Sequence, residues 1–149
     1  MIWCLTKDGD QKAMKIFRRH YSCKNRNPKV AQFVGPGEKM VLVHLNANWH
    51  YDALFVWRKY ISDDNQHGVN CAVFRNESSL LSSEMILEAE RWANDRWPLE
   101  RMYTYVDSSM IKSSHPGYCF IKAGWRKCGK TKSRKLQILE KVNPEFKNG

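Results

Sequence analysis

The chain has 149 residues, of which 42% are apolar and 12% aromatic. This length and composition predict a single folded domain over residues 1–149 and exclude a chain that is disordered throughout. No apolar run approaches the roughly 18 residues that a transmembrane helix needs, so the sequence predicts no membrane partner.

The charge of the chain is strongly positive and unevenly placed. Lys and Arg number 25 against 15 Asp and Glu, which gives a net charge of +10. Residues 11–37 carry +7 and residues 111–149 carry +8, whereas residues 38–110 carry −4. Two basic flanks around an acidic centre predict a polyanionic partner, with DNA as the first candidate. The alternative is surface charge that serves solubility alone.

The cysteines indicate a reducing compartment. They are odd in number, widely spaced and contain no CxxC pair: Cys4, Cys23, Cys71, Cys119 and Cys128. This pattern favours free thiols over a disulfide framework or a zinc site. The first ten residues become acidic too early for a secretory signal. We therefore expect a cytoplasmic protein.

The first half of the chain predicts one helix and several antiparallel strands. Residues 2–5 read as a short strand, and Asp8 or Asp10 is suited to cap a helix over 10–21. After a loop rich in Asn, Pro and Gly, apolar runs predict three strands, at 40–45, 53–60 and 69–75. The connections between these strands are too short for helical crossovers, so we expect an antiparallel meander.

The second half begins with a long amphipathic helix. Ser82 or Ser83 is suited to cap this helix, and Pro98 stops it. A strand parallel to the one before the helix is expected next, at 101–106, then a short helix that ends at Gly124, and finally two strands, at 125–128 and 136–139. The chain would thus end in a basic hairpin and tail over about 126–149. The order predicts an α+β or α/β fold with a mixed central sheet of about six to seven strands flanked by helices.

The stretch Tyr118–Trp125, YCFIKAGW, carries a family resemblance. It is similar to the late-helix signature of the GNAT acyltransferases, an aromatic-x-Lys-x-Gly-aromatic pattern in which the Gly ends the helix. The order of the predicted elements resembles the GNAT fold as well. The resemblance implies a GNAT-like sheet, a transferase activity, and acyl-coenzyme A or another activated group donor as cofactor.

Two departures from the GNAT pattern bear on the cofactor and the catalytic acid. The family carries a glycine-rich stretch where backbone amides hold the coenzyme A pyrophosphate, whereas residues 75–84 here read RNESSLLSSE. Many GNAT enzymes place a Tyr four residues before the helix-ending Gly, to protonate the thiolate, whereas this chain has Phe120 there and Tyr118 two residues earlier. The candidate cofactor-binding residues are then Ser78, Ser79, Ser82, Ser83 and Lys122.

With these departures and its basic charge, the chain resembles a narrower group, the Mom-like DNA-modification proteins of phage Mu and its prophage relatives. The resemblance rests on His50 and Tyr51 before a strand, on Asp107 at the end of YTYVD, and on Tyr118. It implies that these four residues form a catalytic centre. The implied enzyme, in the cytoplasm of a bacterial host, adds a carbamoylmethyl-like group to the exocyclic amine of adenine in DNA, so that restriction enzymes fail to cut.

The residue types suit such chemistry, although each also has an ordinary structural explanation. Asp107 ends a strand where a carboxylate can face a cleft as a general base or metal ligand, or can simply cap the segment that follows. His50 can accept a proton or bind a metal, and Tyr51 can donate a proton, or both can belong to an ordinary polar loop. His50 and Asp107 would supply two ligands of an iron-type divalent metal, with a third from His44 or His115.

Basic and aromatic residues supply candidate DNA contacts. Trp49 and Tyr51 lie in a polar loop and can stack on a base that has left the duplex, with Trp57 and Tyr118 as further candidates. Phosphate contacts, which give affinity but little sequence choice, are expected from the basic residues of both flanks: Arg18, Arg19, Lys24, Arg26, Arg126, Lys127, Lys130, Lys132, Arg134 and Lys135.

Two other functions stay open at this point. An ordinary GNAT N-acyltransferase would act on a protein or a small amine, and the missing glycine stretch argues against it. A GNAT-like module without catalysis would only bind nucleic acid. The sequence leaves the group donor, the DNA context and the oligomeric state open, a dimer included.

Overall fold

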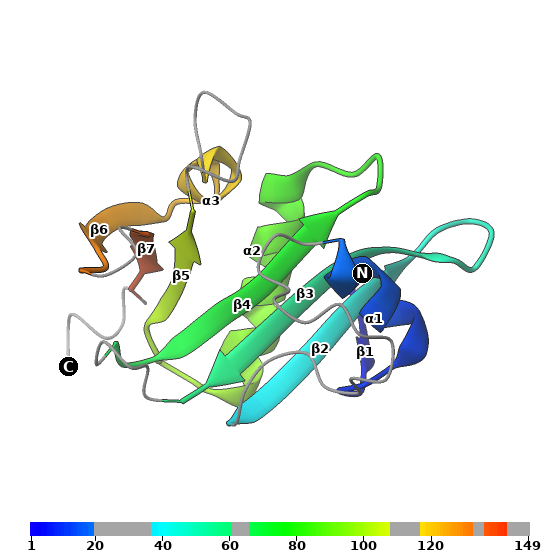
Figure 1. Cartoon of the computed structure of the whole chain (residues 1–149), viewed down its shortest axis with the longest axis horizontal. Helices are drawn as coiled ribbons and strands as arrows, with labels where there is room; N and C mark the ends of the chain where they lie inside the picture. The colour runs from blue at the N-terminus through cyan, green and yellow to red at the C-terminus, as the bar shows by residue number, and fades with distance from the viewer. Residues whose placement is uncertain (20–36, 61–65, 108–116, 133–135, 143–149) are drawn as a thin grey trace.

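The computed structural model of the protein describes residues 1–19, 37–60, 66–107, 117–132 and 136–142 (Figure 1). Along these ranges the helices and strands follow one another in the order that the sequence predicts. The elements are β1 (Cys4–Thr6), α1 (Gln11–Arg18), β2 (Glu38–Leu45), β3 (Tyr51–Lys59), β4 (Val69–Asn76), α2 (Ser82–Arg96), β5 (Met102–Val106), α3 (Tyr118–Lys122), β6 (Arg126–Lys130) and β7 (Gln137–Lys141).

The strands form one mixed sheet in the order β1-β2-β3-β4-β5-β7-β6. All neighbouring strands are antiparallel except β4 and β5. These two run parallel because α2 returns the chain to the end of the sheet at which β4 begins. α1 lies on one face of the sheet, and α2 and α3 lie on the other (Figure 1). The predicted meander, the parallel strand after the long helix and the final hairpin are confirmed.

The larger part of the core lies between the sheet and α2 and is rich in aromatic rings. The ring of Phe55 lies 5.8 Å from that of Trp3 and 4.7 Å from that of Trp57, measured between centroids. The two buried indoles also donate hydrogen bonds to α2, from Trp3 Nε1 to the Met85 carbonyl at 2.8 Å and from Trp57 Nε1 to the Ala89 carbonyl at 2.9 Å. These bonds fix α2 against the sheet. Trp57 is fully buried, so the prediction that it stacks on a base is wrong.

The two long helices begin in different ways. Asp10 caps α1 as predicted, because its Oδ1 accepts hydrogen bonds from two N–H groups of the first turn, at 2.9 and 3.2 Å. The prediction that Ser82 or Ser83 caps α2 is wrong. Leu81 is the N-cap residue, no side chain caps the helix, and the Ser82 hydroxyl accepts instead from Asn76 at 2.9 Å.

Glycines set both ends of the short helix α3. Gly117 precedes it with φ +77°, and a Cβ added there would lie 2.8 Å from Cδ1 of Leu139. Gly124 follows with φ +99°, which confirms the predicted end of this helix. Both positions lie in the left-handed region that favours glycine.

The thiols in the described part of the chain are free: Cys4, Cys71, Cys119 and Cys128. Cys71 lies in the core, where burial raises the pKa of its thiol. Cys23 lies outside the described residues. Within the described ranges, no helix is long and apolar enough to cross a membrane.

Candidate functional site

β4 and β5 diverge toward their carboxyl-terminal ends. They pair only over Val69–Cys71 and Met102–Thr104, whereas β4 continues to Asn76 and β5 to Val106. A bulge at Ala72, in the pairing with β3, falls directly after the last of these pairs. We call this divergence, visible in Figure 1, the β4–β5 fork. The carboxyl ends of parallel strands are where open sheets commonly bind ligands, so the fork is the first candidate for a site.

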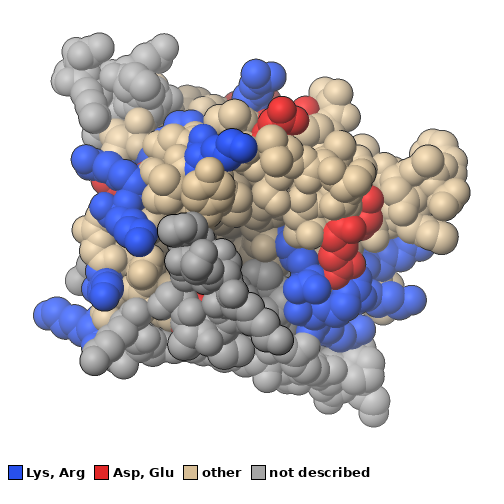
Figure 2. Space-filling model, turned by 90° about the horizontal axis from the view of Figure 1, so that it is seen from above, with Lys and Arg blue, Asp and Glu red and all other residues tan. Residues whose placement is uncertain are grey.

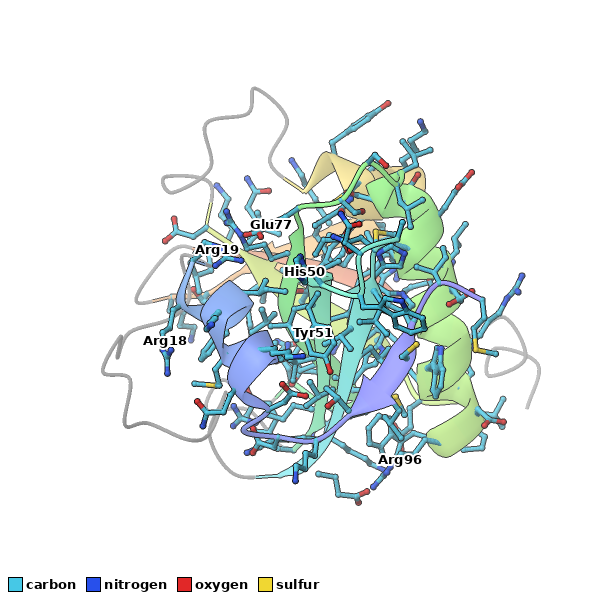
Figure 3. All side chains as sticks on the ribbon, turned by 90° about the vertical axis from the view of Figure 1, so that its right-hand side faces the viewer. Arg18, Arg19, His50, Tyr51, Glu77 and Arg96 are labelled. Carbon is cyan, nitrogen blue, oxygen red and sulfur yellow. The ribbon has the colours of Figure 1, made fainter. Side chains whose placement is uncertain are left out.

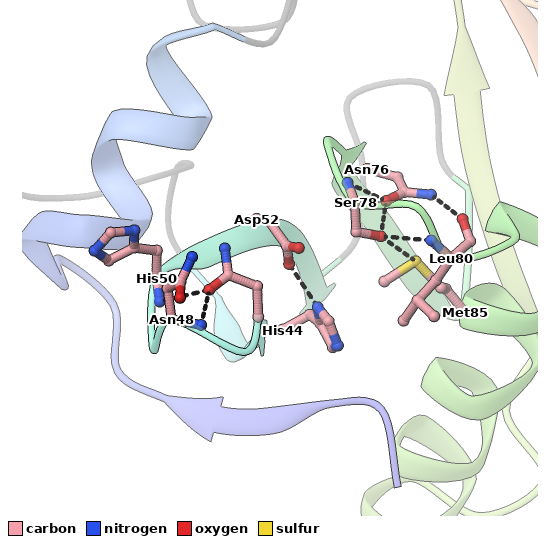
Figure 4. A network of polar contacts seen from close by, with 9 residues as sticks. His44, Asn48, His50, Asp52, Asn76, Ser78, Leu80 and Met85 are labelled. Atoms are coloured by element: carbon pink, nitrogen blue, oxygen red, sulfur yellow. Dashed lines mark hydrogen bonds and ion pairs between the residues drawn. The ribbon is translucent and has the colours of Figure 1, made fainter.

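Asn76 and Ser78 hold the connection from β4 to α2 on a fixed path (Figure 4). Oδ1 of Asn76 accepts from the N–H and the hydroxyl of Ser78, at 2.9 and 2.5 Å. Nδ2 of Asn76 donates to the Leu80 carbonyl and the Ser82 hydroxyl, at 2.8 and 2.9 Å. The Ser78 hydroxyl accepts in turn from the Leu80 N–H at 3.1 Å and lies 3.9 Å from Sδ of Met85. Side-chain hydrogen bonds thus order this connection without any glycine.

Backbone N–H groups at the start of α2 are the anion-binding feature of this connection. The N–H groups of Ser82 and Ser83 have no hydrogen-bond partner among the described residues, and the positive end of the helix dipole lies here. The side chains predicted to contact a cofactor lie in several different environments. Those of Ser78 and Ser82 are engaged within the connection, the Ser83 side chain is buried, and Ser79 and Lys122 are exposed.

Glu77 joins the end of α1 to the start of the same connection (Figure 3). Its carboxylate accepts hydrogen bonds from Nε and Nη2 of Arg19, each at 2.7 Å, and from Nε of Arg75 at 2.6 Å. Its backbone N–H donates to the Asp52 carbonyl at 2.8 Å. Hydrogen bonding to Arg19, followed by that to Arg75, lowers the pKa of Glu77 to about 2. The acid is therefore ionised and locally neutralised at every pH near neutrality.

Glu77→Gln is expected to lower the stability of the fold at pH 7 by roughly 1 kcal/mol, since solvent screens an ion pair that is partly exposed. A carboxyl whose pKa falls on folding stabilises the protein above its ordinary value of 4.5, and this contribution is lost as the pH falls toward 2. Urea unfolding of both proteins from pH 7 to pH 2.5 should therefore show curves that converge in acid. Asp95→Asn, at an exposed acid of α2, is the control and should stay within about 0.5 kcal/mol. A difference that does not depend on pH would contradict the ion-pair explanation.

Asp107 and Tyr118 lie together on the β5 side of the fork. Asp107 follows β5 directly, and Tyr118 is the first residue of α3, with 57% of its surface exposed. Val106 precedes Asp107, and Gly117 precedes Tyr118. These two residues pack closely, since a Cβ added at Gly117 would lie 3.4 Å from Cγ2 of Val106. The structure thus places the backbone of two of the four predicted catalytic residues at the same end of β5.

Phe120 occupies the position where many GNAT enzymes carry a tyrosine, and it belongs to the core. It is buried, and its ring packs edge-on against Trp125 with 4.9 Å between centroids. A hydroxyl at this position would enter an aromatic cluster. Tyr118, the first residue of α3, is therefore the phenol that this helix carries.

His50 and Tyr51 lie on the other side of β4, at the start of β3 (Figure 3). His50 is exposed, and its backbone N–H donates to Oδ1 of Asn46 at 3.1 Å. The phenol of Tyr51 donates to Oδ2 of Asp10 at 3.2 Å, next to α1. β4 therefore separates this pair from Asp107 and Tyr118.

The predicted metal ligands do not form a cluster in the described ranges. No group of three or more His, Cys, Asp or Glu side chains there could hold a metal ion. His44, a possible third ligand, instead pairs through Nδ1 with Oδ1 of Asp52 at 2.5 Å (Figure 4). His115, the other possible third ligand, lies outside the described residues.

Basic side chains gather at two ends of one face of the molecule. Figure 2 shows Lys and Arg over α1 at one end and over the β6–β7 hairpin at the other. Two of the predicted phosphate contacts have carboxylate partners, since Arg19 pairs with Glu77 and Arg126 pairs with Glu140 at 2.6 Å. Arg18 is half-buried, whereas Lys127 and Lys130 are exposed and Lys132 lies in the turn after β6. The remaining predicted contacts lie outside the described residues: Lys24, Arg26, Arg134 and Lys135.

Solved structures resemble the chain over nearly its whole length. Tetrahymena GCN5 superposes with a TM-score of 0.65 at 16% identity, over 97% of this chain and 98% of that one. A spermidine N-acetyltransferase from Vibrio cholerae, in complex with CoA and spermine, gives 0.63 at 12% identity over 98% and 97%. Escherichia coli ElaA gives 0.61 at 12% identity over 94% and 98%. The chain has the GNAT fold.

The GNAT resemblance that the sequence suggests is thus confirmed at the level of the fold. The structural comparisons give no support to the finer resemblance to the Mom-like proteins. No protein-family model and no curated protein matched the chain. The structural comparisons therefore establish the fold and leave the activity as a proposal.

Proposed function

We propose that the protein is an N-acyltransferase that carries an acyl group from a coenzyme A thioester to an amine. The observation that carries this proposal is the β4–β5 fork, which opens beside two N–H groups at the start of α2 that have no partner among the described residues. The structural neighbours include a spermidine N-acetyltransferase in complex with CoA and spermine. A primary amine, such as a polyamine, is accordingly the first acceptor class to test.

The residues at the fork fit a coenzyme A donor. The N–H groups of Ser82 and Ser83 suit a phosphate oxygen, and the β4 edge beyond Cys71, which has no strand partner on β5, suits the amide-containing arm of the donor. Glu77, the acid in this connection, is neutralised by Arg19 and Arg75, so it does not repel a pyrophosphate. When bound there, the donor supplies the activated acyl thioester.

Tyr118 and Asp107 are assigned the proton transfers. As the amine nitrogen bonds to the acyl carbon and the carbon–sulfur bond breaks, the Tyr118 hydroxyl donates a proton to the departing sulfur. The Asp107 carboxylate accepts the proton that the amine loses. Both residues stand on the β5 side of the fork, next to the packed pair Val106 and Gly117. His50 and Tyr51, across β4, are assigned to the acceptor side.

Ser82→Pro is expected to weaken the binding of coenzyme A roughly tenfold to a hundredfold, since a hydrogen bond to a charged group contributes about 1.5–3 kcal/mol. Proline removes the N–H donor but is well tolerated at the first position of a helix. Leu81 before it already has φ −73° and ψ +123°, which the residue before a proline prefers. Calorimetric titration with coenzyme A measures the change.

Ser82→Ala is the matched control for this experiment. It removes the hydroxyl that accepts from Asn76 but keeps the backbone N–H, so coenzyme A should bind it nearly as tightly as the wild-type protein. Equal affinities of Ser82→Pro and Ser82→Ala would show that the start of α2 does not hold the donor.

A second candidate acceptor is the exocyclic amine of a DNA base, adenine first, as the resemblance to the Mom-like proteins implies. The observation that favours it is the pair of basic groups, over α1 and over the β6–β7 hairpin, at the two ends of one face (Figure 2). Phosphates on either side of a modification site would meet both groups.

Nucleoside analysis decides between the two acceptor classes. The chain is expressed in bacteria, the DNA is digested to nucleosides, and the products are examined by mass spectrometry. A new modified adenine would establish DNA as the acceptor. An unmodified profile, with DNA that restriction enzymes still cut, would leave the small or protein-bound amine as the acceptor.

A further inference from the structure

Trp49 stands at the tip of the β2–β3 hairpin with 76% of its surface exposed to solvent. The other five tryptophans of the chain are buried or half-buried. Its φ is +61°, in the left-handed region that residues other than Gly, Asn and Asp rarely adopt. A turn that needed only this backbone shape would be served better by glycine. The position therefore combines an unfavourable backbone with an unburied ring, which calls for a reason.

Asn46 holds the tip of this hairpin in one conformation. Its Oδ1 accepts from the N–H groups of Asn48 and His50, at 2.8 and 3.1 Å. Its carbonyl accepts from the Trp49 N–H at 3.0 Å, and its N–H donates to the His50 carbonyl at 2.9 Å. These four bonds order the backbone that carries the exposed indole, so this backbone has little conformational freedom left to lose on binding.

The exposed basic side of α1 lies next to this hairpin. Nζ of Lys12 is 5.9 Å from the ring centre of Tyr51, two residues from Trp49, and Lys15 is exposed one turn further along α1. The acids nearby are engaged, since Asp8 pairs with Lys39 at 2.7 Å and Asp10 caps α1. Figure 2 shows the Lys and Arg side chains of α1 gathered beside the projecting hairpin.

We infer that this surface, the Trp49 indole with Lys12 and Lys15, binds a nucleic-acid strand that has an unpaired base. The indole stacks on the base, because every base offers a π face, while the two ammonium groups meet the phosphates. Two exposed ammonium groups beside the ring favour a polyanionic strand over an apolar protein surface. This binding is separate from the acyl transfer proposed above, and its test uses no transfer reaction.

The experiment measures, by fluorescence anisotropy, the affinity of the wild-type protein and of its variants for two labelled oligonucleotides. One is an ordinary single strand and the other has the same length with abasic sites, which keeps the phosphates and removes the bases. Trp49→Ala should weaken binding to the ordinary strand roughly tenfold or more, because the substitution removes the ring on which one base stacks. It should leave binding to the abasic strand unchanged. Trp49→Phe should retain most of the affinity.

Two further variants complete the design. Leu99→Ala is the matched control, because Leu99 is also exposed and has φ +65°, and it should bind both strands like the wild-type protein. Lys12→Gln with Lys15→Gln should weaken both strands equally and lower the slope of log affinity against log salt by about 1 for each phosphate that no longer meets an ammonium group. Equal losses on both strands with Trp49→Ala, or no binding of either strand by the wild-type protein, would overturn the inference and leave a protein partner for Trp49.

Discussion

Lys141→Met is expected to lower the free energy of unfolding at pH 7 by about 3–5 kcal/mol, because removing the lysine leaves the charge of the buried Glu90 uncompensated. Oε1 of Glu90, on α2, lies 2.7 Å from Nζ of Lys141, and the two side chains are 8% and 27% exposed. Oε2 of Glu90 accepts from Nε1 of Trp125 at 3.1 Å, and Lys141 also donates to the Ala123 carbonyl at 2.9 Å. The pair thus ties α2, the end of α3 and β7 together.

The loss should depend on pH in a defined direction. Burial raises the pKa of Glu90 even with Lys141 present, and removal of the lysine raises it further. A carboxyl whose pKa rises on folding binds more protons in the folded state, so it opposes folding as the pH rises above its ordinary value. Urea unfolding should therefore show a smaller loss at pH 5 than at pH 7.

Two controls separate this effect from a general loss of charge. Lys127→Met, at an exposed lysine of β6, should change stability by no more than about 0.5 kcal/mol. Combining Lys141→Met with Glu90→Gln removes the stranded charge and should recover part of the stability. A loss below about 1 kcal/mol, or one that is equal at both pH values, would contradict the role given to this pair.

Tyr118→Phe is expected to lower kcat for acyl transfer by roughly 10²–10⁴, the usual contribution of a positioned general acid. Tyr118 is the first residue of α3, and its backbone lies on the β5 side of the fork. The substitution removes one oxygen from an exposed ring, so the fold and the affinity for coenzyme A should not change. Steady-state kinetics with acetyl-coenzyme A, combined with calorimetric binding of coenzyme A, separates the two effects.

Tyr60→Phe is the matched control for that experiment. Tyr60 follows β3 at the end of the sheet away from the fork, and it packs on Arg58. It should leave kcat within about twofold. If Tyr118→Phe also retains full kcat, the departing sulfur takes its proton from another donor, and the site has been misplaced along α3.

The arrangement of elements was predictable because its signals are local. The apolar runs, the short polar connections and the amphipathic stretch before Pro98 each depend on neighbouring residues. Gly124 was recognisable as a helix end for the same reason, since only a glycine adopts its φ of +99° at little cost. These signals determine the order of strands and helices, and with it the position of the fork.

The contacts that shape the site were not predictable, because they join residues far apart in the chain. Glu77 meets Arg19 across 58 residues and Glu90 meets Trp125 across 35, and no spacing rule connects such pairs. The capping prediction for α2 failed because the helix begins earlier than expected: Leu81 is the N-cap, and Ser82, whose hydroxyl accepts from Asn76, is already the first residue of the helix. The sequence Asn76-Glu77-Ser78 does carry a signal, since an Asn side chain commonly bonds to the backbone two residues on, and the same applies to Asn46 and Asn48 in the hairpin.

We propose above that the protein takes an acyl group from coenzyme A and gives it to an amine. The most direct measurement is incubation of the purified chain with radiolabelled acetyl-coenzyme A and spermidine, a lysine-containing peptide or single-stranded DNA, followed by separation of the acceptors. We expect label in at least one acceptor, and a rate that falls sharply in Tyr118→Phe and in Ser82→Pro. Unlabelled acceptors, together with no saturable binding of coenzyme A by the wild-type protein, would contradict the claim.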